Sequence, residues 1–386
     1  MRSISYAELA WPAVAELPRG TPLVIPLGLQ AFDPKAAAQA LESDSVVVLP
    51  AVPFGFPQPN AGLLADLAFG RALLRRMLIA IRRELAAQGF QRVVFLDAGN
   101  VGNALSRERL NFLQVPRLTG PITAWPSDLA RRVVVISTGH TEQHGHHLAV
   151  GTDTYIVEAI AEGLSKAASE DVVCLPVWPY GASTHTREYP ATLDLGGRLF
   201  EDLCVALVGR LVDVGARMIL FSNGHGGNHS HLVNVVKAAG ERWPQAFTAT
   251  EFLHTTGPAL ERYRQSPRGG LGHGCELETS YMLHLRPDLV DMNKATVETD
   301  FISTKNYFMD WIEGGRLIAN PPWSDDTTSG IYGDATLATA EKGRLWLEAA
   351  IAEKLELLDE IRVQQERRQA RRRSKAPRSR GRTSPY

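Results

Sequence analysis

Through the middle of the chain, short apolar segments alternate with longer segments of mixed apolar and polar residues. Short, nearly continuous apolar runs that predict strands lie at VVVIS (133–137), VVCLPV (172–177), MILFS (218–222) and AFTATEFL (246–253). Longer stretches that predict helices lie at about 153–168, 197–214 and 228–241. Buried apolar strands separated by helices are typical of a parallel sheet with helices on both faces, so the pattern predicts an α/β fold. A loop-rich, aromatic segment follows residue 284, and a last helix is predicted to start near Asp334 or Thr336.

The first 130 residues carry the same order of elements. The correspondences are GTPLVIPLGLQ (20–30) with RRVVVISTGHTEQ (131–143), VVVLPAVPFG (46–55) with VVCLPVWPYG (172–181), and ELAAQGFQRVVFLDAGNVGN (84–103) with RLVDVGARMILFSNGHGGN (210–228). Three matches in one order indicate an internal duplication. We therefore predict a degenerate copy over residues 1–125 and an intact copy over residues 126–360.

The two copies differ in their histidines. All eleven histidines lie between His140 and His284, and the first 139 residues contain none. Where the second copy has Glu142 and His144, the first has Gln30 followed by Ala, Phe and Asp. The front copy is therefore interpreted as a structural or interface-forming pseudo-domain. A separate binding site among its polar loops is the alternative.

Composition narrows the class of protein. The chain has 386 residues and 44% hydrophobic content, which is ample for a large core. No run of about 18 apolar residues predicts a transmembrane helix, and the N-terminal segment lacks the apolar core of a signal peptide. Three cysteines favour a reduced compartment over a disulfide framework. These features predict a cytoplasmic protein with no membrane partner.

The charge is unevenly distributed along the chain. The formal net charge is −1, but residues 367–386 carry nine Arg or Lys and no acid, which leaves −10 for the remainder. Such a tail cannot bury a core, so it is predicted to be disordered and solvated. The tail could contact nucleic acid, but the acidic body disfavours a nucleic-acid partner.

The stretch EQHGHHLAVGTD (142–153) is the first candidate for chemistry. It follows a predicted strand directly, which is where open α/β sheets place their ligands. Glu142 and His144 are two residues apart in an extended loop and would point the same way. Asp153 lies where the next helix begins, so it could be an N-cap, a metal ligand, or both through separate oxygens. Taken alone, the stretch is equally well explained as a polar turn.

Two glycine-flanked motifs add further candidates. In NGHGGN (223–228), the glycines permit a tight turn and a close approach to a ligand, and no P-loop lysine is present. In GHGCELETS (272–280), His273, Glu276 and Glu278 lie where a loop enters a helix. The two acids could instead stabilise the dipole of that helix.

A fourth segment, WPYGASTH (178–185), supplies Trp178, Tyr180 and His185 either as packing residues or as substrate contacts. All four segments border strand ends, and a parallel sheet would gather them along one edge. Carboxylates and imidazoles suit Zn, Mn or Fe. A carboxylate shared between two ions would favour hydrolysis by metal-activated water.

The motifs EQHGHHLAVGTD, NGHGGN and HGCELETS, with GDATLATAEKG near the C-terminus, resemble the creatininase (creatinine amidohydrolase) family over about residues 130–355. The resemblance implies a three-layer Rossmann-like domain, a hydrolytic site with one or two divalent ions, and often hexameric assembly. It also implies metal ligation by Glu142, His144, Asp153 and His225, with Asp153 as the bridge. His273 matches the position proposed to shuttle a proton to the leaving group, and Glu278 is the candidate for the remaining ligand.

Other residues are assigned roles around this set. Glu276 is a candidate for orienting His273, and His146 and His147 are at most pocket residues. The candidate substrate contacts are Trp178, Tyr180, His185 and Asn223.

One position departs from creatininase itself. Gly227 stands where creatininase has a metal-binding glutamate, which argues against creatinine as the substrate. Either Glu278 takes over as the ligand, or one metal site is weaker. The NGHGGN form is similar to formamide-cleaving enzymes of deazaflavin biosynthesis, a peptide-trimming enzyme of mycofactocin maturation, and a hydrolase of oxidised inositols. The duplicated front half is not typical of any of them.

The sequence as a whole therefore predicts a metal-dependent amidohydrolase with two ions, drawn from Zn, Mn or Fe. It would cleave an amide, cyclic amide or formamide bond of a small molecule. The alternatives are carbon–carbon ring opening of an oxidised inositol, or a non-catalytic binding and assembly protein. A homo-oligomer is expected, either a trimer of two-lobed chains or a hexamer.

Overall fold

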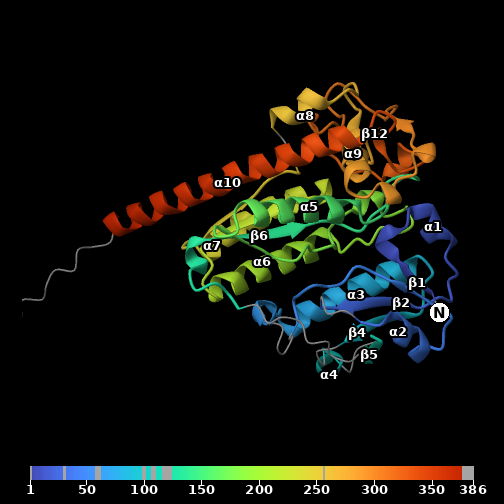
Figure 1. The fold of residues 1–386 in the computed structure, drawn as a ribbon, viewed down its shortest axis with the longest axis horizontal. Helices are drawn as coiled ribbons and strands as arrows, with labels where there is room; N and C mark the ends of the chain where they lie inside the picture. The colour runs from blue at the N-terminus through green and yellow to red at the C-terminus, as the bar shows by residue number, and fades with distance from the viewer. Residues whose placement is uncertain are drawn as a thin grey trace, which may run out of the picture.

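The computed structural model describes residues 2–28, 32–56, 62–97, 101–105, 110–114, 124–254 and 257–375, and two parallel sheets dominate it (Figure 1). The front sheet, in spatial order, consists of β1 (Arg2–Ser5), β3 (Ser45–Val48), β2 (Leu23–Leu27), β4 (Val93–Asp97) and β5 (Phe112–Gln114). The back sheet consists of β7 (Val172–Cys174), β6 (Val133–Thr138), β8 (Met218–Asn223) and β9 (Phe247–Thr250). We call the described residues up to 114 the front lobe and those from 124 onward the back lobe.

Helices separate and cover the two sheets. The front lobe has α1 (Trp11–Glu16), α2 (Pro34–Ala40), α3 (Arg71–Ala87) and α4 (Val101–Leu105). The back lobe has α5 (Thr152–Ala167), α6 (Gly197–Asp213), α7 (His229–Arg242), α8 (Pro258–Tyr263), α9 (Glu276–Leu285) and α10 (Ala340–Lys375). A small antiparallel sheet, in the order β10 (Leu271–His273), β12 (Tyr332–Asp334) and β11 (Val297–Glu298), joins the end of the back lobe.

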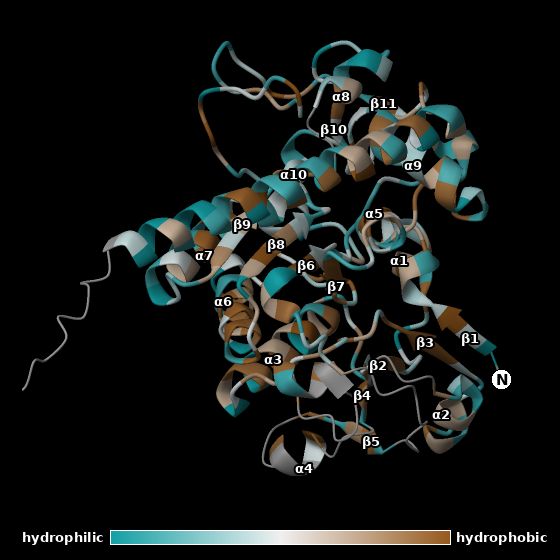
Figure 2. Ribbon diagram, turned by 60° about the vertical axis from the view of Figure 1, so that its left-hand side comes forward, coloured by the Kyte–Doolittle hydropathy of each residue, from teal (hydrophilic) through white to brown (hydrophobic). Residues whose placement is uncertain are grey.

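The largest hydrophobic core lies between the two sheets. It combines front-lobe side chains such as Ile25 and Met77 with back-lobe side chains such as Ile136 and Phe200, so α3 and α6 pack in one continuous interior. The opposite face of the back sheet is covered by α5, α9 and α10, whose apolar residues form a second core with Val133 and Val135. Figure 2 shows hydrophobic strands between helices with polar outer faces. The back lobe is therefore the three-layer α/β unit expected from the alternating pattern.

The strands of the back sheet lie where the apolar runs predict them, but the start of the last helix differs. We predicted a start near Asp334 or Thr336, whereas α10 begins at Ala340. Asp334 ends β12, and its carboxylate accepts hydrogen bonds from the backbone N–H and the hydroxyl of Thr336. This local turn competes with helix formation. In the sequence alone, an Asp that bonds the backbone in a turn cannot be distinguished from an Asp that caps a helix.

The prediction of a disordered tail from Arg367 is wrong for its first nine residues. The helix α10 continues to Lys375, and residues 376–386 lie outside the described part of the chain. The Arg368 guanidinium lies 4.9 Å from the centroid of the Phe247 ring, and Arg372 donates to the Pro244 carbonyl. These contacts with the edge of the back sheet support a basic helix that composition alone would leave unfolded.

The two sheets share one strand order. The order β3-β2-β4-β5 in front matches β7-β6-β8-β9 behind, strand for corresponding strand, and β1 adds an edge to the front sheet. Isolated parallel bridges also occur at corresponding places, Leu27 with Val52 and Thr138 with Trp178. Duplication stays a prediction that this arrangement supports. The front-lobe counterparts of the site loops, at 29–31 and 98–100, lie outside the described residues.

None of the described helices is both long enough and apolar enough to cross a membrane.

Candidate metal centre

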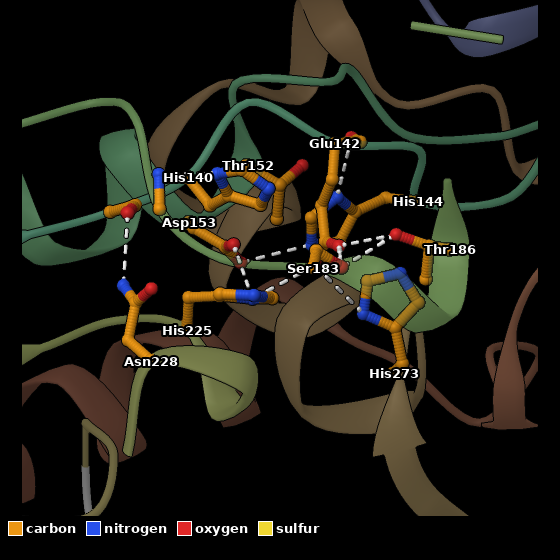
Figure 3. Close-up of polar contacts among 12 residues, drawn as sticks. His140, Glu142, His144, Thr152, Asp153, Ser183, Thr186, His225, Asn228 and His273 are labelled. Carbon is orange, nitrogen blue, oxygen red and sulfur yellow. Dashed lines mark hydrogen bonds and ion pairs between the residues drawn. The ribbon is translucent and has the colours of Figure 1, made fainter. Parts of the chain in front are cut away.

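Six ionisable side chains meet at the carboxyl end of the back sheet. Figure 3 labels all of them except Glu278. The loop between β6 and α5 supplies Glu142 and His144, α5 supplies Asp153, the turn after β8 supplies His225, and β10 and α9 supply His273 and Glu278. Each side chain is no more than 4% exposed apart from the His273 side chain at 5%. Burying three carboxyl groups together is strongly unfavourable unless cations compensate for them.

Asp153 lies between two imidazoles. Its Oδ1 is 3.0 Å from Nε2 of His144, and its Oδ2 is 3.2 Å from Nδ1 of His225. Asp153 is the second residue of α5, and the residue that precedes this helix, Gly151, makes no side-chain cap. The N-cap alternative for Asp153 is therefore wrong, and its two oxygens are placed as in a bridging carboxylate.

Glu142 also divides its oxygens between two tasks. Oε2 accepts hydrogen bonds from the hydroxyls of Ser183, at 2.6 Å, and Thr186, at 3.0 Å. Oε1 lies 3.0 Å from Nδ1 of His225 and 3.6 Å from Nδ1 of His273. Neither Oε1 of Glu142 nor Oδ2 of Asp153 has a hydrogen-bond donor, because the short approaches to His225 lack the geometry of a hydrogen bond.

The outer nitrogen of each of three imidazoles is bonded to a backbone carbonyl. His225 Nε2 lies 3.2 Å from the Ala182 oxygen, His144 Nδ1 lies 3.1 Å from the Glu142 oxygen, and His273 Nε2 lies 2.7 Å from the Gln143 oxygen. A carbonyl can only accept, so each of these nitrogens carries the proton. In the neutral ring the other nitrogen then presents a lone pair to the carboxylates, which is repulsive unless a cation lies between them.

Electrostatics show the same demand for positive charge. Burial opposes protonation of His144, but Asp153 and Glu278 outweigh it and raise the pKa of His144 to about 9. Burial raises the pKa of Glu278 to about 8. Burial together with His144 lowers the pKa of His273 to about 4, so that ring is neutral. Without a metal, the cluster retains protons that bound cations would replace.

The donor set fits divalent ions. Buried groups that could hold an ion are His144 with Asp153 and Glu278, Glu142 with His144 and His273, and His140 with Glu142 and His225. Mixed imidazole and carboxylate donors suit Zn, Mn or Fe, and the outward hydrogen bonds of the imidazoles are those usual for metal-binding histidines. Orphaned acceptors on Glu142 and Asp153 are the atoms that such ions would satisfy.

His140 belongs to the site, although no role was predicted for it from the sequence motifs. It is fully buried, and its ring centroid lies 4.6 Å from that of His225. Its Nδ1 accepts the backbone N–H of Gly181 at 2.8 Å, and burial lowers its pKa to about 3, so neutral His140 carries its proton on Nε2. That Nε2 has no partner. His140 thus differs from the three imidazoles above, since its N–H rather than its lone pair is unpaired.

The expected role of Glu276 is not supported. Its carboxylate accepts hydrogen bonds from the backbone of Gln265 and Ser266 and forms a buried ion pair with Lys342. It makes no contact with His273 among the described residues. Glu276 and Glu278 lie two apart in a helix, so they point to different sides, and only Glu278 faces the metal cluster.

Two expected substrate contacts are packing residues instead. The Trp178 ring packs against Phe54 and Phe69, and the Tyr180 hydroxyl donates to the Pro50 carbonyl. Both side chains are buried against the front lobe, which their aromatic character alone did not indicate.

The other two expected contacts lie beside the cluster. Asn223 donates to the His225 carbonyl and accepts from the His225 N–H, so it shapes the turn that carries this histidine. The His185 ring is parallel to the His225 ring at 6.2 Å and lies 4.4 Å from the Trp323 ring. Trp323 also lies 5.2 Å from His273. Trp323 is therefore the aromatic residue nearest the imidazoles, and the aromatic segment after residue 284 was its only sequence signal.

Gly227 has no room for a side chain. A Cβ there would lie 2.4 Å from the Ala182 oxygen and 2.5 Å from Nε2 of His225. A glutamate at this position would displace the turn. Glu278, whose Oε1 lies 3.9 Å from Nε2 of His144, is left as the additional carboxyl group at this edge.

Comparisons with known proteins agree with this architecture. The family model described as creatininase, creatinine amidohydrolase, matches residues 124–358. The mycofactocin precursor peptide peptidase of Mycolicibacterium smegmatis is 31% identical over 228 residues, covering 55% of this chain and 78% of that protein. Creatinine amidohydrolase of Pseudomonas putida is 26% identical over 235 residues, covering 57% and 85%. A solved structure described as creatininase with Mn has a TM-score of 0.51 at 24% identity, over 63% of this chain and 96% of that one, which shows a shared fold.

The fold and the buried carboxylate–imidazole cluster define a metal-binding α/β hydrolase. The chain belongs to the creatininase family, with the match confined to the back lobe. The front lobe lies outside the matched residues.

Proposed function

We propose that the protein hydrolyses a C–N bond of a small molecule with two divalent ions bound in the cluster. One ion would be held by Glu142, Asp153 and His225, and the other by His144, Asp153 and Glu278. The observation that carries the proposal is the orientation of the imidazoles. With their outer nitrogens bonded to backbone carbonyls, His144 and His225 turn their other nitrogen toward a carboxylate, where it holds a proton that a bound ion would replace. Zn, Mn and Fe are the candidate ions.

When bound, such ions lower the pKa of a coordinated water and polarise the scissile carbonyl. The residues of the chain supply the remaining tasks. His273 is neutral, with Nδ1 facing Glu142, so it can accept a proton there and pass it to the leaving nitrogen. The unpaired Nε2–H of His140 can donate to an oxygen of the substrate, and Trp323 closes the side next to His185 and His273.

Within this reaction class, we propose a substrate other than creatinine. Gly227 stands where the resemblance implies a metal-binding glutamate in creatininase, and the atoms around Gly227 leave no room for such a side chain. The mycofactocin precursor peptide peptidase from Mycolicibacterium smegmatis supports a peptide bond as the target. A second candidate is ring opening of an oxidised inositol, since a 3-dehydro-scyllo-inosose hydrolase of Thermotoga maritima is 25% identical over 238 residues.

A substrate panel tests the proposal. Protein loaded with Mn or Zn is assayed against cyclic amides, formamides, short peptides and keto-inositols, with the metal-free protein in parallel. We expect turnover of a C–N substrate that is lost with the metal and absent in His225→Ala. Turnover that survives complete removal of metal would contradict the proposal, and turnover of keto-inositols alone would favour the second candidate.

A further inference from the structure

The front lobe contacts the segments that hold the metal ligands. The segment that follows β1 accepts two of these hydrogen bonds through backbone carbonyls: the Leu9 carbonyl accepts the N–H of Val150 at 2.8 Å, and the Ala7 carbonyl accepts that of Gly151 at 2.9 Å. Both N–H groups lie directly before α5 and its Asp153. A Cβ on Gly151 would lie 2.9 Å from the Ala7 oxygen, so glycine permits this close approach.

A second set of contacts runs from α3 to the loop 184–195, which surrounds Glu142. Gln88, the C-cap residue directly after α3, donates from Nε2 to the Thr192 carbonyl at 2.9 Å and accepts the Ala191 N–H at Oε1 at 2.8 Å. Ala191 has φ of 77°, a left-handed conformation that is unfavourable for a residue other than glycine. The paired amide of Gln88 therefore stabilises a strained residue of the back lobe.

The same loop is bonded to the metal-binding loop. The Thr192 hydroxyl accepts the N–H of Gln143, the residue between Glu142 and His144, at 3.2 Å. Leu193 donates its N–H to the Thr141 carbonyl at 3.0 Å. Thr192 thus links Gln88 to the metal-binding loop. Its carbonyl accepts from Gln88, and its hydroxyl accepts from Gln143, which lies between two proposed metal ligands.

Glu84 provides a parallel route one helical turn earlier in α3. Its carboxylate, 3% exposed, receives both Nε and Nη2 of Arg187, at 3.0 and 2.5 Å. Arg187 follows Thr186, whose hydroxyl donates to Oε2 of Glu142. Such a bidentate pair is directional as well as strong.

We infer that the front lobe positions the metal centre, with Gln88 and Glu84 holding loop 184–195 in the conformation that orients Glu142 and the backbone beside His144. A domain that only covers an apolar face would need no polar side chains paired with this loop. The role explains how a lobe without a histidine contributes to the site of its neighbour. The inference rests on the metal centre proposed above.

The test uses two variants and one matched control in the full-length chain. Gln88→Ala removes the paired amide, and Glu84→Gln keeps the shape of the side chain while removing its charge. The control is Arg76→Ala, which breaks another ion pair between the lobes, Arg76 with Asp202, at 2.7 Å and with both side chains about half exposed. Affinity for Zn or Mn is measured by competition with a chromophoric chelator, and hydrogen exchange is measured over loop 184–195.

We expect Gln88→Ala and Glu84→Gln to weaken metal binding by about tenfold, the lower end for residues behind metal ligands. Exchange in loop 184–195 should rise in both, while Arg76→Ala stays within about twofold of the wild type in metal affinity. Wild-type metal affinity in both variants would overturn the inference. If Gln88→Ala does not fold, the metal affinity of Glu84→Gln alone decides the test. If the wild-type protein itself binds no ion, the proposed function fails instead.

Discussion

At the scale of single residues, the acids Glu276 and Glu278 have different predicted roles. Glu276 stabilises the fold through its ion pair with Lys342, and Glu278 is a proposed metal ligand. Glu278→Gln should remove one of the two ions, because it deletes a ligand beside His144. Glu276→Gln should keep both ions but lower the free energy of unfolding by about 3 kcal/mol, because Lys342 is left buried without its counter-charge. Elemental analysis and chemical denaturation of both variants check this pair. Equal metal content in the two variants would contradict the assignment of Glu278.

Proton release gives a second test at this scale. The carboxylates of Asp153 and Glu278 outweigh burial and raise the pKa of metal-free His144 from 6.5 to about 9, so a metal must displace its proton near neutral pH. The raised pKa stabilises the metal-free fold fully below pH 6.5, and this contribution disappears as the pH rises through about 9. Metal affinity should therefore increase with pH between these values. Calorimetry in buffers of different ionisation enthalpy measures the number of protons released on metal binding. A metal affinity that does not change with pH, with no proton released, would contradict this prediction.

The sequence indicates the residues of the buried cluster better than it indicates their neighbours. Glu142, His144, Asp153, His225, His273 and Glu278 all come together as the motifs suggest. The role of Trp178 and Tyr180 depended on which lobe they face, and only tertiary structure decides that. His140 was missed because its role follows from the hydrogen bond to Gly181, which has no sequence pattern.

At the scale of elements, the crossing of α9 and α10 controls the position of Glu278. A Cβ on Gly343, the final glycine of GDATLATAEKG, would lie 1.9 Å from the Ser280 oxygen. Gly343→Ala should therefore push α10 from α9 and lower the free energy of unfolding by about 1–3 kcal/mol. Because α9 carries Glu278, metal affinity should fall as well.

The matched control for that change is Gly240→Ala in α7, where no heavy atom lies within 4 Å of the added Cβ. It should stabilise the protein slightly, by about 0.5–1 kcal/mol, since alanine favours a helix interior. Thermal unfolding of both variants provides the comparison. A Gly343→Ala protein as stable as the wild type would show that the two helices do not cross as closely as described.

Strand positions in the back sheet followed from apolar runs, because a parallel strand covered on both faces has a nearly continuous apolar run. Helix ends were less predictable. Local side-chain bonding at Asp334 delays α10, and packing against Phe247 extends it beyond Arg367. The first effect is a local turn that looks like a helix cap in the sequence. The second depends on Phe247, which is distant in the sequence.

At the scale of the whole molecule, the two lobes share one hydrophobic core, and the candidate metal centre lies at the carboxyl end of the back sheet. Metal removal should lower the midpoint of thermal unfolding in a concentration-dependent manner, because ions bind the folded state. A chelator titration followed by circular dichroism measures the shift. An unchanged midpoint at saturating metal would mean that the cluster does not bind ions in the folded protein.

Assembly remains a proposal at this scale. We propose a trimer of two-lobed chains, in which the front lobe replaces one subunit contact by covering α6 through α3. Light scattering of the purified protein tests it. A monomer would contradict the trimer.

The most direct test of the central claim is the metal content of the purified protein, measured by inductively coupled plasma mass spectrometry beside Asp153→Asn. We predict two divalent ions for each wild-type chain, and a folded Asp153→Asn protein that holds neither ion firmly because the bridging carboxylate is gone. A folded wild-type protein that binds no divalent ion when Zn or Mn is supplied would contradict the account.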